Sequence, residues 1–147
     1  MLERFCLAAG EGKFGYVLVA SASFWESVNL PGDTLQLVVI DKLPFPSPGD
    51  PLVQARSQRL MEQGRSPFTN YFLPKASIAL QQGAGRQIRR ESDCGILVMC
   101  DARLANKGYG RLILATRPPM RRMNDLAAYH EALEALTRAS TKVARAA

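Results

Sequence analysis

Three short runs of consecutive apolar residues stand out along the chain, at residues 16–20 (YVLVA), 35–41 (LQLVVID) and 95–100 (GILVMC). A run without polar alternation is typical of a strand that is covered on both faces, as in a parallel sheet. The runs are separated by helical or irregular stretches long enough for parallel connections. We therefore expect an α/β fold with a short, mainly parallel sheet that is flanked by helices.

The connection between the second and third runs begins with a proline-rich stretch, residues 43–51, which excludes a regular element there. At its end, Asp50 and the proline after it are typical of an N-cap and a first helical residue. The pattern predicts a helix from this point to about Gln63, ended by Gly64.

We expect a loop at residues 65–73. A second helix is expected to begin at Pro74 and to lead into residue 82. We expect Ile78 and Leu80 of this helix to pack on the sheet.

Helical spacing also marks the two ends of the chain. Residues 2–9 have apolar positions at helical intervals and are followed closely by two glycines. Near the C-terminus, Asn124 is a suitable N-cap for a final helix with one apolar stripe. Residues 109–115 fit either a short helix or a strand, and residues 140–147 are expected to fray. The stripe of the final helix consists of Leu126, Tyr129, Leu133 and Leu136.

The net charge of +6 favours polyanionic partners, although an ordinary solvated surface would also carry it. No apolar run approaches the roughly 20 residues that a membrane span needs, and the charged N-terminus does not resemble a signal peptide. The three cysteines, Cys6, Cys94 and Cys100, have no paired spacing. We interpret them as buried thiols of a cytoplasmic protein and expect no metal site from them.

Two familiar catalytic patterns fail. The glycines before Lys13 resemble part of a P-loop, but Leu7 stands where the first glycine belongs and Phe14 replaces the Ser or Thr. His130 is followed one turn later by Glu134, so the histidine pair of a zinc protease is not formed.

Residues 82–89 (QGAGRQIR) form a better candidate site. Arg86 and Arg89 lie three residues apart, and their planar, permanently charged guanidinium groups suit a triphosphate whose γ-phosphoryl group is leaving. Gly85 would allow close approach of the backbone, and Gln82 can bond a phosphate or a water molecule. The alternative is a surface turn on which both arginines pair with the acidic residues at 91 and 93.

Four blocks in order resemble the XPD/DinG group of superfamily 2 helicases, most closely its bacterial DinG/YoaA-like branch. QGAGRQIR resembles motif VI (Q-x-x-G-R-x-I-R), and SASFWESVNLPGD, after the first apolar run, resembles motif V (S-F-W-E-G-V-D-x-P-G). VVIDKLPFPSPGDPL and GILVMCDARL, with its D-x-R, also match in order and spacing. The resemblance covers roughly residues 2–120.

The resemblance implies a RecA-like second helicase lobe that closes over ATP bound on a first lobe. Arg86 and Arg89 would then be catalytic and reach the γ-phosphate, with Gln82 and Gly85 beside them at the nucleotide. Motif V would couple the nucleotide to single-stranded DNA. Its implied nucleotide contacts are Glu26 and Asn29, and its implied DNA contacts are Ser23 and Trp25.

Motif V departs from the family pattern at two positions, because Ser27 replaces a glycine and Asn29 replaces an aspartate. Both changes put its contacts in doubt. Trp25 is either a core anchor of the motif V loop or a platform for base stacking.

The family's P-loop, its Mg²⁺-holding acidic motif and its iron–sulfur cysteines belong to the first lobe, which this sequence does not contain. We therefore expect residues 1–123 to form the second lobe, residues 124–147 to form a helical tail, and the chain alone to be inactive and to self-associate. Its expected function is that of a motor lobe of an ATP-dependent DNA helicase in DNA repair or replication. The alternative is a stand-alone nucleic-acid-binding or adaptor module that retains the fold.

Overall fold

The computed structural model describes residues 17–21, 35–85, 94–116 and 119–144. Within them, strands β1 (Leu37–Ile40) and β2 (Ile96–Met99) pair in parallel, with Leu37 opposite Ile96 and Ile40 opposite Met99. The amide of Ile96 donates to the Gln36 carbonyl at 2.8 Å, and the amide of Cys100 donates to the Ile40 carbonyl at 2.9 Å. The prediction of a parallel α/β sheet is confirmed for these two runs.

The first apolar run differs from the prediction. Residues 17–20 are not part of a strand, and Val17 and Val19 have 84% and 85% of their surface exposed. A strand is maintained by hydrogen bonds to a neighbouring strand, and in the described part of the chain the sheet consists of β1 and β2. Apolar composition alone therefore does not place this segment in the sheet.

Strand β1 is also less covered than its apolar run predicted, whereas β2 has no exposed residue. Val38, Leu97 and Met99 pack against the core on one face, whereas Leu37 and Val39 of β1 are exposed on the other. Alternation of side chains across a strand explains the difference between neighbouring residues. Only one face of β1 is covered.

The connection from β1 to β2 contains helix α3 (Pro51–Glu62), the π-helix η2 (Phe68–Phe72) and helix α4 (Leu73–Ala84). The side chain of Asp50 caps α3 by accepting from the amides of Leu52 and Val53, and Gly64 after the helix has a φ of 68°. The predicted start and end of α3 are confirmed.

The loop predicted at residues 65–73 is wrong, because η2 occupies most of it and continues directly into α4. The amide of Leu73 donates to the carbonyl of Phe68, one residue further back than in an α-helix. Pro74 lies in the first turn of α4, directly after the π-helix.

Beyond β2, the chain forms α5 (Arg103–Asn106), α6 (Gly108–Ala115) and α7 (Leu126–Ala144). Helix α6 decides the open choice between helix and strand at residues 109–115. The cap of α7 is Asp125 rather than the predicted Asn124, since its Oδ1 accepts from the amide of Ala128 at 2.8 Å. Most of the predicted stripe on α7 is half-buried, but Leu126 is exposed, and the expected fraying does not begin at residue 140 because α7 continues to Ala144.

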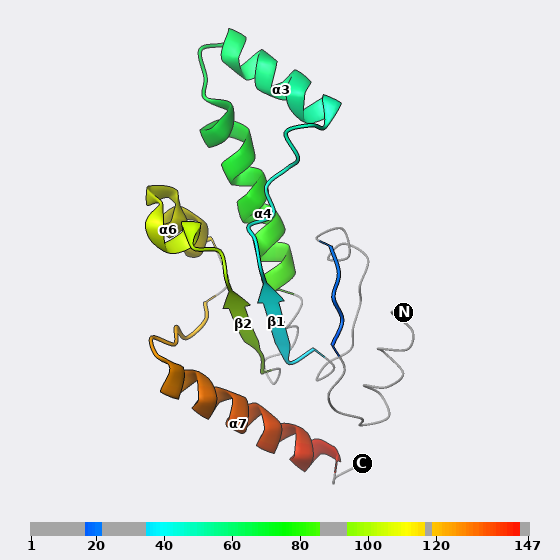
Figure 1. Ribbon diagram of the computed structural model, residues 1–147, viewed down its shortest axis with the longest axis vertical. Helices are drawn as coiled ribbons and strands as arrows, with labels where there is room; N and C mark the ends of the chain where they lie inside the picture. Colours follow the sequence, from blue (N-terminus) through cyan, green and yellow to red (C-terminus); the bar gives the residue numbers. More distant parts are fainter. Residues whose placement is uncertain (1–16, 22–34, 86–93, 117–118, 145–147) are drawn as a thin grey trace.

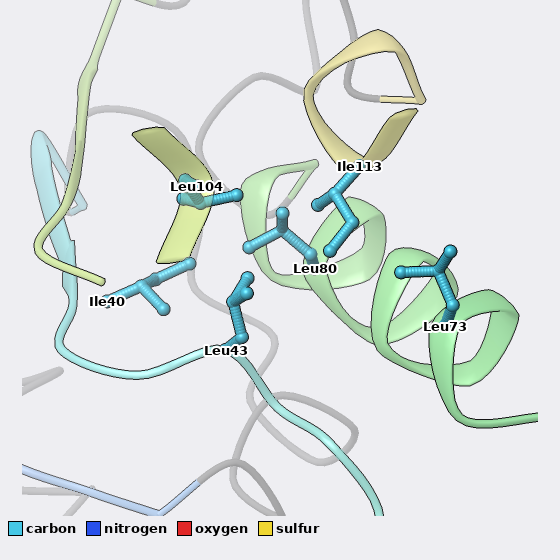
Figure 2. Close-up of a cluster of buried hydrophobic side chains, with 6 residues drawn as sticks. All are labelled: Ile40, Leu43, Leu73, Leu80, Leu104 and Ile113. Atoms are coloured by element: carbon cyan, nitrogen blue, oxygen red, sulfur yellow. The ribbon is translucent and has the colours of Figure 1, made fainter. Parts of the chain in front are cut away.

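The core lies at the carboxyl ends of the strands (Figures 1 and 2). Figure 2 shows Leu80 of α4 in the middle of this cluster, with Leu43 and Leu104 on one side and Ile113 of α6 on the other. Leu80 and Ile113 are almost completely buried, at 1% and 0% exposure. The cluster consists of Ile40, Leu43, Leu73, Leu80, Leu104 and Ile113.

One expected core position is wrong. Ile78 is 51% exposed, because α4 buries the face that carries Ala76, Leu80 and Ala84 at intervals of four residues. Two residues from either neighbour, Ile78 points to the opposite side of the helix. Helical geometry overrides the apolar character of this side chain.

A glycine sets the distance between α5 and α6. A Cβ added at Gly110 would overlap the carbonyl oxygen of Leu104 and lie 2.8 Å from its Cα. We expect Gly110→Ala to lower the free energy of unfolding by about 2 kcal/mol or more, since the backbone must move. Chemical denaturation followed by circular dichroism measures it.

Gly108→Ala is the matched control, because a Cβ there meets nothing within 4 Å. It should be neutral or stabilising, as alanine has the better helix propensity. Equal stability of the two variants would contradict the close approach of α5 and α6.

Candidate functional site

The described part of the 82–89 motif lies at the end of α4. Gln82 is exposed on the last turn of the helix, and Gly85 follows as its C-cap with its amide donating to the Gln81 carbonyl at 2.9 Å. Spaced three residues apart, Gln82 and Gly85 lie on neighbouring positions of the helix surface. The buried Gly83 and Ala84 anchor this turn in the protein.

Gly85 has a right-handed backbone conformation, so its role does not depend on a positive φ. A Cβ at this position would lie 3.2 Å from the Gln81 carbonyl oxygen, closer than most side chains tolerate. A side chain at Gly85 would therefore crowd the preceding helical turn, while the predicted close approach of its backbone to a phosphate stays a prediction.

Six other predicted site residues lie outside the described residues. They are the motif VI arginines Arg86 and Arg89 and the motif V residues Ser23, Trp25, Glu26 and Asn29. Leu2 to Ala9, Cys6 and Ser27 also lie outside them.

Asp101 and Arg103, the D-x-R of the fourth block, form the best-defined polar cluster of the described chain. The guanidinium of Arg103 binds both carboxylate oxygens of Asp101, through Nη2 at 2.6 Å and Nε at 2.9 and 3.1 Å. The second partner is distant in sequence: the backbone amide of Leu43 donates to Asp101 Oδ2 at 2.8 Å. We call these three residues the Asp101 clamp.

The clamp joins the ends of the two strands. Leu43 follows β1 and Asp101 follows β2, so the carboxylate links the segments through which the chain leaves the sheet. The Asp101 side chain is 7% exposed, whereas that of Arg103 is 43% exposed and places its guanidinium carbon 5.1 Å from the centre of the Phe45 ring. A buried carboxylate with this many donors is well compensated for the loss of water.

The electrostatic effects follow from this geometry. The hydrogen bonds from Arg103 lower the pKa of Asp101 far below its ordinary value, with burial opposing the shift and the Leu43 amide supporting it. In return, the Asp101 carboxylate raises the pKa of Arg103. The pair is therefore charged throughout the neutral range.

Three aromatic rings surround the clamp. Phe45, Phe68 and Tyr109 contact one another with ring centroids 5.1 to 6.2 Å apart. They come from the loop after β1, from η2 and from α6, so the sequence contains no periodic signal for the group. The signal for the clamp was present as an acidic residue directly after a strand, but the Leu43 partner was not visible in it.

The prediction of buried cysteines is wrong for the two that the structure describes. Cys94 and Cys100 are both exposed, because they lie beyond the two ends of β2 rather than within it. Among the described residues, no group of three or more His, Cys, Asp and Glu side chains is placed to hold a metal ion. The described helices also include none that is long and apolar enough to cross a membrane.

Comparison with known proteins agrees with the resemblance to helicases. The model of the family described as "Helicase C-terminal domain" matches residues 1–120. The ATP-dependent DNA helicase YoaA of Escherichia coli is 52% identical over 127 residues, which are 86% of this chain and 19% of the relative. The ATP-dependent helicase DinG of Mycobacterium tuberculosis is 35% identical over 142 residues, 97% of this chain and 21% of the relative.

The names of the relatives do not all indicate the same activity. The relative from Bacillus subtilis, named 3'-5' exonuclease DinG, is 40% identical over 102 residues, 69% of this chain and 11% of its own length. The chain spans about a fifth of the length of the YoaA and M. tuberculosis DinG relatives.

In the described residues, the chain is a small α/β unit in which two parallel strands are joined by a helical crossover. The chain belongs to the helicase C-terminal domain family, within its DinG/XPD group.

The clamp generates a prediction about pH. An unfolded aspartate has a pKa near 3.9, above that of native Asp101, so the unfolded chain takes up this proton first as the pH falls. The stabilisation is fully present above about pH 5 and is lost as the pH falls through 4 and below. Urea titrations between pH 7 and 3 should show this loss.

Asp101→Asn should cost about 2 kcal/mol of unfolding free energy at pH 7 and reduce the acid-dependent loss. Arg103 is too exposed for its Coulomb attraction to add much. Glu134→Gln removes a carboxylate from an exposed i,i+4 pair and should change neither quantity much. If the pH dependence of stability were unaltered in Asp101→Asn, the Asp101 clamp would not be its source.

Proposed function

We propose that this chain is the second motor lobe of an ATP-dependent DNA helicase that acts in DNA repair or replication in the cytoplasm. In this role Arg86 and Arg89 stabilise the γ-phosphate of ATP and Mg²⁺ bound on a first lobe, with Gln82 and Gly85 beside them. The iron–sulfur cluster that the family resemblance implies belongs to that first lobe.

The observation that carries the proposal is the anchoring of α4. Its last turns bury Leu80, Gly83 and Ala84, while Gln82 is exposed and Gly85 ends the helix. This anchored helix ends directly before residues 86–89 in the sequence. An anchored neighbouring turn supports the proposal because the stabilisation of a transferring phosphoryl group depends on the position of the arginines.

In the same proposal, motif V binds both DNA and the nucleotide. Ser23 and Trp25 contact single-stranded DNA. Glu26 and Asn29 contact the nucleotide, so that ATP hydrolysis changes the affinity of the lobe for DNA. Residues 1–123 form the lobe and residues 124–147 form an appended helical tail. The end of the family match at residue 120 and the start of α7 at Leu126 support this division.

The arginines are tested in a protein that joins this chain to a first lobe. We expect Arg89→Ala to lower the DNA-stimulated ATP turnover by about 10³-fold, the scale of a lost arginine finger. Arg138→Ala, which removes an exposed arginine of α7, should leave turnover unchanged.

The 147-residue chain alone should hydrolyse no ATP, because two arginines do not replace the amide cradle, lysine and Mg²⁺ that hold the phosphates. Turnover of Arg89→Ala near that of the unaltered protein would overturn the motor assignment and favour an adaptor role.

Self-association is proposed for the 147-residue chain because an apolar part of β1 is open. Leu37 and Val39 are 40% and 57% exposed on one face of the strand. An exposed apolar strand favours pairing with another chain. Light scattering during gel filtration at micromolar concentration should give a mass above 16.2 kDa.

Val39→Lys should shift the mass to the monomer, since a charge opposes such pairing. Leu112→Lys is the control, as it changes an equally exposed apolar residue on α6. A monomeric mass for the unaltered chain would contradict the proposal.

A further inference from the structure

The segment from Pro51 to Lys75 projects from the carboxyl ends of the strands (Figure 1). It contains α3, the turn at Gly64, η2 and the first turn of α4, and we call it the basic hairpin. In Figure 1, α3 lies at the opposite end of the molecule from α7. In open α/β sheets, ligands bind outside the carboxyl ends of the strands.

The charge of the basic hairpin is strongly one-sided. Its four basic side chains and one acidic side chain give a net charge of +3 over 25 residues. The acidic residue, Glu62, accepts a hydrogen bond from Gln58. The ion pairs among the described residues are Asp101–Arg103 and Glu134–Arg138, so none of them involves a basic side chain of the hairpin. The basic side chains are Arg56, Arg59, Arg65 and Lys75.

Two of these arginines share one side of α3. Arg56 and Arg59 are exposed and three residues apart, and Arg56 borders the inner side of the helix that carries the buried Val53 and the half-buried Leu60. The exposed parts of their guanidinium groups can reach adjacent phosphates of one strand. Permanently charged forks of this kind are well suited to bind phosphate.

Arg56 is also paired with an aromatic ring. Its guanidinium carbon lies 5.4 Å from the centre of the Tyr71 ring, and that ring meets Phe72 at 5.7 Å. Tyr71 is only half-buried, so part of the ring remains open to solvent. Because Arg56 lies over one face of the ring, the opposite face is the candidate platform for an unpaired base.

The π-helix maintains this arrangement. Wide turns of this type are rare and occur often at functional sites. Arg65 Nη2 donates to Asn70 Oδ1 at 2.6 Å at one end of η2, and Phe68 contacts Phe45 and Tyr109 of the body. Tyr71 is thus held opposite α3 by contacts on both sides.

We propose that the basic hairpin binds single-stranded DNA, with phosphates on Arg56 and Arg59 and one base stacked on Tyr71. The proposal rests on the proposed function for the identity of the strand. It adds a contact surface outside motifs V and VI. A single strand fits better than a duplex, because stacking on Tyr71 requires a base that is free of its partner.

The test uses the 147-residue chain and a fluorescein-labelled oligothymidylate of about twelve nucleotides, with binding followed by fluorescence anisotropy over a series of salt concentrations. Arg56→Gln and Arg59→Gln should each reduce the slope of log affinity against log salt by about 0.7, the contribution of one phosphate contact on a single strand. Arg138→Gln removes the same charge from α7 and should leave the slope unchanged.

The stacking contact has its own pair of variants. Tyr71→Leu should weaken binding by at least about fivefold at constant salt, whereas Tyr71→Phe retains the ring and should bind as the unaltered chain does. Thermal unfolding by circular dichroism shows whether Tyr71→Leu remains folded, and the arginine variants decide the outcome if it does not.

Absence of binding by the unaltered chain at low salt, or an equal loss in Arg138→Gln, would overturn this inference. Absence of binding would also count against the DNA contacts proposed for Ser23 and Trp25, whereas an equal loss in Arg138→Gln would count against the hairpin alone. The role of the motif VI arginines is read separately, from the ATP turnover of Arg89→Ala. Conversely, if Arg89→Ala does not lower the ATP turnover, the anisotropy series still tests independently whether the hairpin binds single-stranded DNA.

Discussion

The carboxylate of Asp101 accepts hydrogen bonds from the Leu43 amide and the Arg103 guanidinium, and so joins the two points at which the chain leaves the sheet. A two-stranded sheet has little intrinsic stability, and it needs packing on at least one face. The clamp fixes the segment after β1 against the segment after β2, and both lead into the hydrophobic core. The Arg103 guanidinium extends this link to Phe45 and the rings around it.

Helix α4 connects the hydrophobic core to the candidate nucleotide site. Leu73 and Leu80 pack with Leu43 and Ile113, and the same helix ends in Gln82 and Gly85. One rigid element therefore connects the core to the first residues of motif VI. Helix α4 continues from η2 at its other end. The basic hairpin and the start of motif VI therefore lie at the two ends of α4.

This layout suggests how nucleotide and DNA contacts are related in the proposed lobe. A displacement of α4 along its axis would move the turn at Gly85 and the rings of η2 together, because no flexible linker separates η2 from α4. Packed cores of this kind move as units rather than deform continuously.

The sequence by itself determined the α/β class, two of the strands, the caps of α3 and the family, because these depend on local patterns and ordered motifs. The tertiary structure alone decided the exposure of Ile78 and the two described cysteines, the π-helix at Phe68–Phe72 and the state of residues 17–20. It also decided the partner of Asp101, which lies 58 residues away in the sequence. Burial, strand pairing and long-range hydrogen bonds depend on which segments meet, and local composition does not contain that information.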